Sequence, residues 1–197
     1  MAEKIINTSA IPSSDVPERA LLLSEGSNHV WQLPVPNPDE PNSALTYFVH
    51  TGDANDAALR VKTSLLTQLL SEPAFNILRT QEQLGYIVHC SQLVLARECH
   101  TGIKIVVQSE RAPAYLEERV EAFLDGMRTK IEDMPSEEFE AQKRGLARQW
   151  TERLKNLREE TNRFWKYIEA GHLDFLRSEL AILCFDYMET YDTFRNQ

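Results

Sequence analysis

The segment RTQEQLGY, residues 79–86, carries side chains that could do chemistry at a point where a helix is expected to end and a strand to begin. If Arg79 and Tyr86 point the same way from this turn, each can donate a hydrogen bond to a carbonyl group, and the charged guanidinium makes the stronger bond. An ordinary helix end explains the same residues, because Arg79 lies three residues before Glu82 and four before Gln83, spacings at which helical side chains interact. Local physics alone favours this ordinary interpretation, and the functional one stays open beside it.

Motifs for metal or nucleophile chemistry are absent from the sequence. No histidine lies in H-E-x-x-H or in the inverted H-x-x-E-H, and there is no G-x-S-x-G, P-loop or G-x-G-x-x-G motif. His50 and His89 fall in expected strands that could bring them together as zinc ligands, but packed or surface histidines are the simpler interpretation. The other histidines are His29, His100 and His172.

Acidic pairs and one aromatic residue with basic neighbours also have structural explanations. Trp165, close to Arg163 and Lys166, is expected to pack on the apolar side of a helix rather than to form a binding patch. Three acidic pairs are expected in first helical turns, where carboxylates complement the helix dipole instead of acting as acid and base. These pairs are Glu117-Glu118, Glu137-Glu138 and Glu159-Glu160.

Composition narrows the class of protein and the kinds of partner. The 197 residues include 21 basic and 30 acidic side chains, a net charge of −9, so nucleic acid and anionic membrane surfaces are poor partners. No run of 18 apolar residues predicts a membrane span. The cysteines, Cys90, Cys99 and Cys184, are odd in number and lack C-x-x-C spacing, which indicates reduced thiols and a cytoplasmic location. Residues 1–20 have no signal-peptide pattern and are expected to be a linker or lead-in.

The elements expected from periodicity and breakers come in blocks of strands and helices. The expected strands are residues 29–35, 43–51, 86–95 and 102–109, the last two forming an antiparallel hairpin. Residues 56–70 are expected to be helical, and Ser71 and Pro73 are expected to start a second helix that stops at Gly85. Further helices are expected from Pro113, from a Ser136 cap, around Phe164 and over residues 178–194. This order predicts an α+β fold, a two-layer sandwich whose mostly antiparallel sheet is covered by helices on one face.

Four stretches of the sequence resemble one family. EPAFNILRTQEQLGYIV (residues 72–88) resembles a signature in the C-terminal half of insulin-degrading enzyme (insulysin) and its pitrilysin-type relatives, which are zinc metallopeptidases with the inverted H-x-x-E-H motif. The likeness covers about residues 20–185. The other stretches are IVVQSERAPAYLEERVEAFL, IEDMPSEEFEAQKRGLA and FWKYIEAGHLDF.

The resemblance implies a fold and a role for particular residues. Family members pair homologous domains of the metallopeptidase LuxS/MPP-like fold into two halves that enclose a chamber, and zinc lies in the first domain. Residues 21–197 resemble the fourth domain, a non-catalytic copy, and are expected to lack its closing helix and strand, which would leave an unpaired sheet edge. The resemblance places Arg79 and Tyr86 as substrate-binding residues that contact the peptide backbone near the cleaved bond.

The expected function is therefore a substrate-positioning, chamber-closing domain of an insulysin-like zinc metalloendopeptidase. No catalytic residue and no metal ligand is expected in this chain, and zinc is expected in the N-terminal half. The expected partners are peptide substrates and that catalytic half, and the chain alone is expected to be inactive. The alternatives are a stand-alone, non-catalytic peptide- or partner-binding module and an enzyme with an unrecognised site of its own.

Overall fold

The computed structural model describes residues 24, 26–95, 100–170 and 175–187. The chain divides into two units, Met1–Trp31 and Gln32–Gln197, and every helix and strand described belongs to the second unit. The expected lead-in at residues 1–20, Cys99, His172 and residues 188–194 lie outside the described residues.

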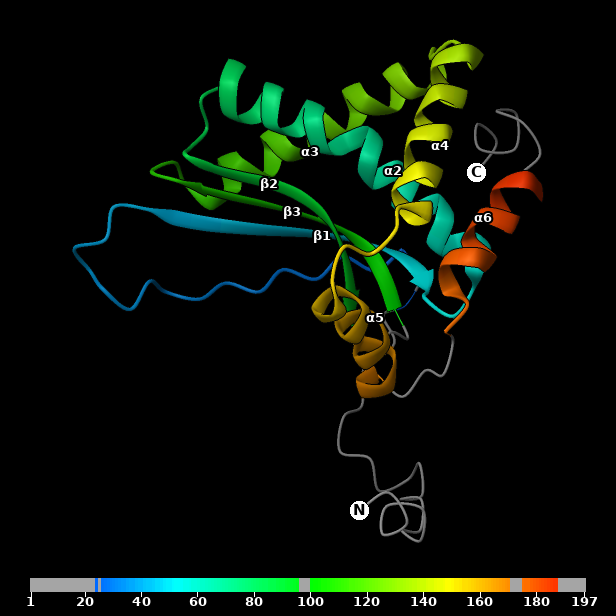
Figure 1. Cartoon of the computed structure of the whole chain (residues 1–197). Helices are drawn as coiled ribbons and strands as arrows, with labels where there is room; N and C mark the ends of the chain where they lie inside the picture. Colours follow the sequence, from blue (N-terminus) through cyan, green and yellow to red (C-terminus); the bar gives the residue numbers. More distant parts are fainter. Residues whose placement is uncertain (1–23, 25, 96–99, 171–174, 188–197) are drawn as a thin grey trace, which may run out of the picture. The chain divides into compact units, whose positions relative to one another are not determined.

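The sheet has three antiparallel strands in the described part of the chain (Figure 1). They are β1 (Ser43–Asp53), β2 (Ile87–Leu95) and β3 (His100–Ser109), in the spatial order β1-β3-β2. The predicted hairpin is confirmed, because β2 pairs with β3 from Ile87 opposite Gln108 to Leu95 opposite His100. β1 pairs with the other edge of β3 and is interrupted by an irregularity between His50 and Gly52.

The strand predicted at residues 29–35 is wrong, because the structure has no strand there. Every residue of this segment, HVWQLPV, is exposed. Pro34 lies in this segment and Pro36 directly after it, and neither has the N–H group that a strand ladder would need. A short apolar segment without a pairing partner therefore does not make a strand.

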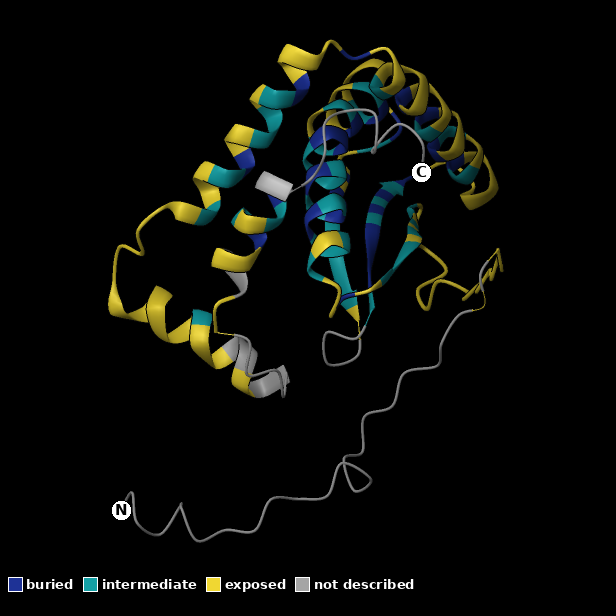
Figure 2. Ribbon diagram, turned by 90° about the vertical axis from the view of Figure 1, so that its right-hand side faces the viewer, coloured by how far each residue is buried: buried dark blue, intermediate teal, exposed yellow. Residues whose placement is uncertain are grey.

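One face of the sheet is covered by helices α2 (Ala57–Ala74) and α3 (Pro113–Glu132), together with the π-helix η2 (Phe75–Gln81) (Figures 1 and 2). Their apolar residues form one buried cluster with the inward side chains of the strands. Burial of this apolar surface stabilises the fold by roughly 25 cal/mol per Å². The buried members of the cluster are Leu70, Ala74, Leu78, Leu84, Val88, Cys90, Ile103, Ile105, Val107, Leu116, Val120, Phe123 and Met127.

A second apolar cluster joins α2 to α4 (Ser136–Thr151) and α6 (Arg177–Tyr187). Helix α2 therefore buries residues on two sides, with Leu65 and Leu69 in this cluster and Leu70 in the first. Trp150 of α4 stacks on Phe185 of α6, with ring centres 5.2 Å apart. The prediction of an α+β chain with a mostly antiparallel sheet is confirmed.

Helix α5 (Leu157–Ala170) is largely exposed in Figure 2. Trp165 is 59% exposed, so the prediction that it packs on the apolar side of a helix is wrong. Of the three acidic pairs, Glu137-Glu138 and Glu159-Glu160 lie in first helical turns as predicted, whereas Glu117-Glu118 lies deeper in α3.

The helix boundary predicted at Ser71 is also wrong. Helix α2 runs through Pro73 to Ala74 and continues directly into η2. The Ser71 hydroxyl donates back to the Thr67 carbonyl oxygen at 2.6 Å instead of capping a new helix. Pro73 costs one backbone hydrogen bond, and the burial of Leu70, Ala74 and Leu78 in the core compensates for it.

Candidate functional site

The η2–β2 corner, residues 79–86, turns the chain from the π-helix into the central hairpin. The helix ends at Glu82, whose N–H donates to the Ile77 carbonyl oxygen at 2.9 Å. Gln83 takes the left-handed conformation with φ 51°, and Leu84 is buried with its N–H bonded to the Leu78 carbonyl oxygen at 3.0 Å. The prediction that a helix runs to Gly85 is therefore wrong, because the left-handed residue that ends it is Gln83.

Gly85 has a different reason to be glycine. A Cβ at this position would collide with the carbonyl oxygen of Gln108 in β3. The same end of β3 holds the corner through Ser109, whose hydroxyl donates to the Leu84 carbonyl oxygen and accepts from the Arg111 N–H at 3.0 Å. The corner is thus fastened to the middle strand of the sheet by a close backbone approach and a buried hydroxyl.

Arg79 and Tyr86 lie together on this corner. The guanidinium carbon of Arg79 is 5.0 Å from the centre of the Tyr86 ring and 4.6 Å from the centre of the Phe75 ring. Cation–π contacts at exposed sites contribute about 0.5–1 kcal/mol each, so the two rings favour one position of the guanidinium. Tyr86 is 83% exposed and Phe75 is 46% exposed, which leaves the group open to a binding partner.

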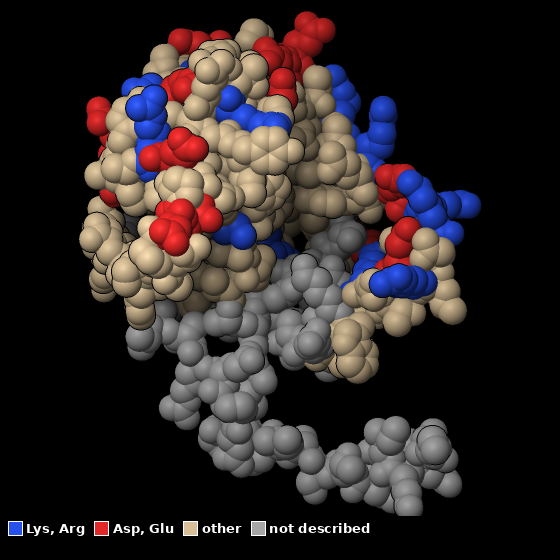
Figure 3. Space-filling model, turned by 90° about the vertical axis from the view of Figure 1, so that its left-hand side faces the viewer, with Lys and Arg blue, Asp and Glu red and all other residues tan. Residues whose placement is uncertain are grey.

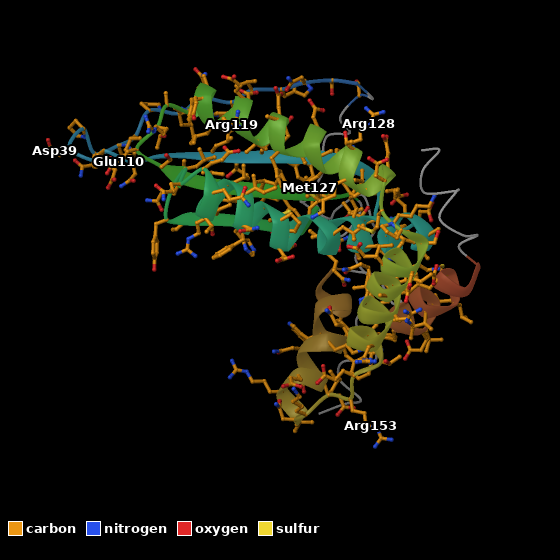
Figure 4. The ribbon with its side chains drawn as sticks, turned by 90° about the horizontal axis from the view of Figure 1, so that it is seen from above. Asp39, Glu110, Arg119, Met127, Arg128 and Arg153 are labelled. Atoms are coloured by element: carbon orange, nitrogen blue, oxygen red, sulfur yellow. The ribbon has the colours of Figure 1, made fainter. Side chains whose placement is uncertain are left out.

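Glu82, the residue that sequence spacing offers as a partner for Arg79, binds a residue of α3 instead. Arg119 donates from Nε to Oε2 and from Nη2 to Oε1 of Glu82, both at 2.8 Å. These hydrogen bonds, and after them the charge of Glu82, raise the pKa of the Arg119 guanidinium above its usual value. Figure 4 labels Arg119 on α3, the helix that lies beside the corner.

Sequence reasoning missed Phe75, Glu82 and Arg119 as parts of the site. Phe75 could have been found from its position four residues before Arg79, a spacing at which helical side chains meet. Arg119 had no comparable signal, because it lies 37 residues from Glu82. A pair so far apart in sequence becomes visible only when α3 is placed on the sheet.

The histidines do not form the zinc site considered for His50 and His89. These two residues lie on β1 and β2, which flank opposite edges of β3. His50 instead meets His100, with Nε2 and Nδ1 3.3 Å apart. Among the residues described, no group of three or more His, Cys, Asp or Glu side chains is placed to hold a metal ion. The described residues therefore offer no set of ligands that fits the zinc ion implied by the family resemblance.

The face drawn in Figure 3 shows basic and acidic residues interspersed, without an extended basic area. Every helix in the described ranges is too short or too polar to span a lipid bilayer.

Comparison with known proteins agrees with the resemblance of the corner. A family model described as "PQQ synthase PqqF-like, C-terminal lobe domain 4" matches residues 65–165, which include the whole corner and Arg119. The insulin-degrading enzyme of Drosophila melanogaster is 36% identical over 168 residues, 84% of this chain. The human insulin-degrading enzyme is 34% identical over 174 residues, 87% of this chain. The chain spans 16% of the length of each of these relatives.

The fold agrees as well. The crystal structure of pitrilysin matches with a TM-score of 0.67 and 25% sequence identity, covering 80% of this chain and 17% of that chain. The predicted family is confirmed: the chain belongs to the PqqF-like C-terminal lobe domain 4 family and is a C-terminal domain of the insulysin and pitrilysin type of metallopeptidase.

Proposed function

We propose that this chain is the fourth, chamber-closing domain of an insulysin-like zinc metalloendopeptidase and that its corner positions the peptide substrate. In this proposal residues 21–197 have the two-layer LuxS/MPP-like sandwich in a non-catalytic copy. The zinc ion and the general base come from the N-terminal half. This chain contributes hydrogen-bond donors, and by itself it cleaves nothing.

The observation that supports the proposal is the pair of the half-buried Arg79 and the exposed Tyr86 on a corner that β3 holds in place. Arg79 would hold the substrate backbone through a charge-assisted hydrogen bond. The Tyr86 hydroxyl would donate to the developing oxyanion or to the adjacent carbonyl oxygen. Because donors held in place before the reaction need no reorganisation, a rigid corner suits this role better than a mobile loop.

The cysteines support a reducing compartment for this function. Cys90 is buried and Cys184 is half-buried, and both are free thiols. We propose a cytoplasmic location on this ground, and fractionation of cells that express a tagged chain tests it.

The test combines the chain with an N-terminal half that carries H-x-x-E-H and follows cleavage of a fluorogenic peptide. Tyr86→Phe is expected to lower kcat by on the order of 100-fold, and to lower kcat more than it raises KM, as for the loss of one oxyanion donor. Arg79→Ala is expected to raise KM as well. Tyr115→Phe, a change at an exposed tyrosine of α3, is the matched control and should leave both constants unchanged.

Unchanged kinetics in both Tyr86→Phe and Arg79→Ala would reject the proposed role of the corner. The alternative, a stand-alone peptide-binding module, predicts peptide binding by the chain alone and no cleavage when the N-terminal half is added. Robust cleavage by the two halves together excludes that alternative.

A further inference from the structure

We propose that Arg119 is a positioning residue for the Arg79–Tyr86 pair and that it acts by holding the Glu82 carboxylate away from Arg79. The inference rests on the proposed function, because it concerns the two residues to which that function assigns peptide binding. It adds a residue of α3, outside the corner, to the parts that the site needs.

The geometry leaves Glu82 fully engaged. Arg119 bonds to both carboxylate oxygens at 2.8 Å, the two-pronged arrangement that gives both strength and a fixed orientation. The side chains of Arg119 and Glu82 are 34% and 21% exposed, so the pair is shielded from part of the solvent. Neither oxygen of Glu82 is left without a guanidinium N–H.

Arg79 is the competing partner. It lies inside the π-helical turn that the N–H of Glu82, the C-cap of η2, closes on the Ile77 carbonyl oxygen, so its side chain starts within one turn of the Glu82 carboxylate. Its present neighbours are the Phe75 and Tyr86 rings, whose attraction for a cation is of similar size to that of an exposed ion pair. A released Glu82 carboxylate would therefore draw Arg79 out from between the rings, and the donor would no longer be presented beside Tyr86.

This mechanism predicts in which variants Arg79 leaves the Phe75 and Tyr86 rings. Arg119→Gln releases Glu82 and should displace Arg79. Glu82→Gln removes the competing charge, so Arg79 should stay between the rings. The double variant should recover what Arg119→Gln loses. A pair that only braces the fold predicts the opposite, with both single variants harmful and no recovery in the double variant.

The first measurement uses the chain alone. NMR of the Arg79 side chain reports the ring-current shift caused by the two aromatic rings, and thermal melting shows that each variant is folded. Arg119→Gln is expected to reduce this shift about 2-fold or more, since the competing attractions are of similar size. Glu82→Gln and the double variant are expected to keep it.

The second measurement is peptide cleavage with the N-terminal half. A loss of about 2- to 5-fold in kcat/KM is expected for Arg119→Gln, with recovery in the double variant, on the same energetic grounds. An unchanged Arg79 shift in Arg119→Gln, or a double variant that does not recover the shift, overturns the proposal. If Arg119→Gln does not fold, Arg119→Lys replaces it, because an ammonium cannot reproduce the two-pronged bond.

The two measurements separate this inference from the proposed function. A shift that follows the predicted order while cleavage stays constant supports the role of Arg119 and rejects the role of the corner in catalysis. A shift that does not follow the order rejects the role of Arg119, whatever the kinetics of Tyr86→Phe show.

Discussion

Gly85 approaches the carbonyl oxygen of Gln108 so closely that a side chain at this position would overlap the backbone of β3. The contact joins the residue two positions before β2 to the end of β3, which stops at Ser109. Glycine is needed here for space, since the left-handed turn residue is Gln83. The position of Tyr86, the next residue, is therefore set by the sheet.

Gly85→Ala should destabilise the chain by about 1–3 kcal/mol, as expected when extra atoms are forced into a packed site. Gly126→Ala is the matched control, because a Cβ there meets nothing within 4 Å. Gly126 lies inside α3, so alanine should stabilise the helix by about 0.5–1 kcal/mol. Urea unfolding of both variants measures the two effects, and equal effects of the same sign would contradict the close contact.

Ser109→Ala should also destabilise the fold, by about 1–3 kcal/mol, since it leaves the buried Leu84 carbonyl without its donor. The Arg111 N–H loses its acceptor in the same variant. Thr129→Ala removes an exposed hydroxyl that bonds only within α3, and it should change the free energy of unfolding little. A Ser109→Ala variant as stable as Thr129→Ala would show that the hydroxyl does not hold the corner.

Two helix starts should respond differently to the loss of a polar side chain. The Asp56 carboxylate accepts from the N–H groups of Ala58 and Leu59 at 2.9 and 3.2 Å, so Asp56→Ala should cost about 1 kcal/mol. Ser136, predicted from sequence as a cap, is instead the first residue of α4, and Pro135 occupies the cap position without a side-chain bond. Ser136→Ala should therefore cost less than Asp56→Ala, which thermal unfolding can measure.

Cys90 should resist alkylation. Burial raises the pKa of its thiol to about 11, and a hydrogen bond with Ser71 offsets part of that rise. The folded pKa lies above the unfolded value, so the contribution of the protonated thiol to stability is full below about pH 8.5 and is lost as the pH rises toward 11. At pH 9, site-resolved mass spectrometry should find Cys184 modified by iodoacetamide well before Cys90, and equal rates would contradict the burial.

The sheet could be predicted where the sequence carries a local pattern. Alternation of Ile103, Ile105 and Val107 predicted β3, and the short link before it predicted the hairpin with β2. Helix boundaries were harder, because Pro73 looks like a start in isolation. Burial of Ala74 and Leu78 beyond it outweighs one lost backbone hydrogen bond, and that comparison needs the tertiary structure.

The sequence singled out the residue types of the candidate site, and the residues that support them could not be predicted from it. Arg79 and Tyr86 stand out by chemistry and by family resemblance, and the structure brings them to one cation–π group. Their supports come from β3 and α3, through contacts between residues far apart in sequence. No local pattern connects Glu82 to Arg119 or Gly85 to Gln108.

The π-helix η2 lets the chain absorb a change of length. The hydrogen bond from Glu82 to Ile77 spans five residues, so η2 holds one residue more than an α-helical turn would. Deleting a residue there could be accommodated by rewinding this segment as α-helix, whereas a deletion in α2 would rotate every following helical side chain by about 100°. A one-residue deletion in η2 after Leu78 would therefore leave that core residue in place and change mainly which side chains the corner presents.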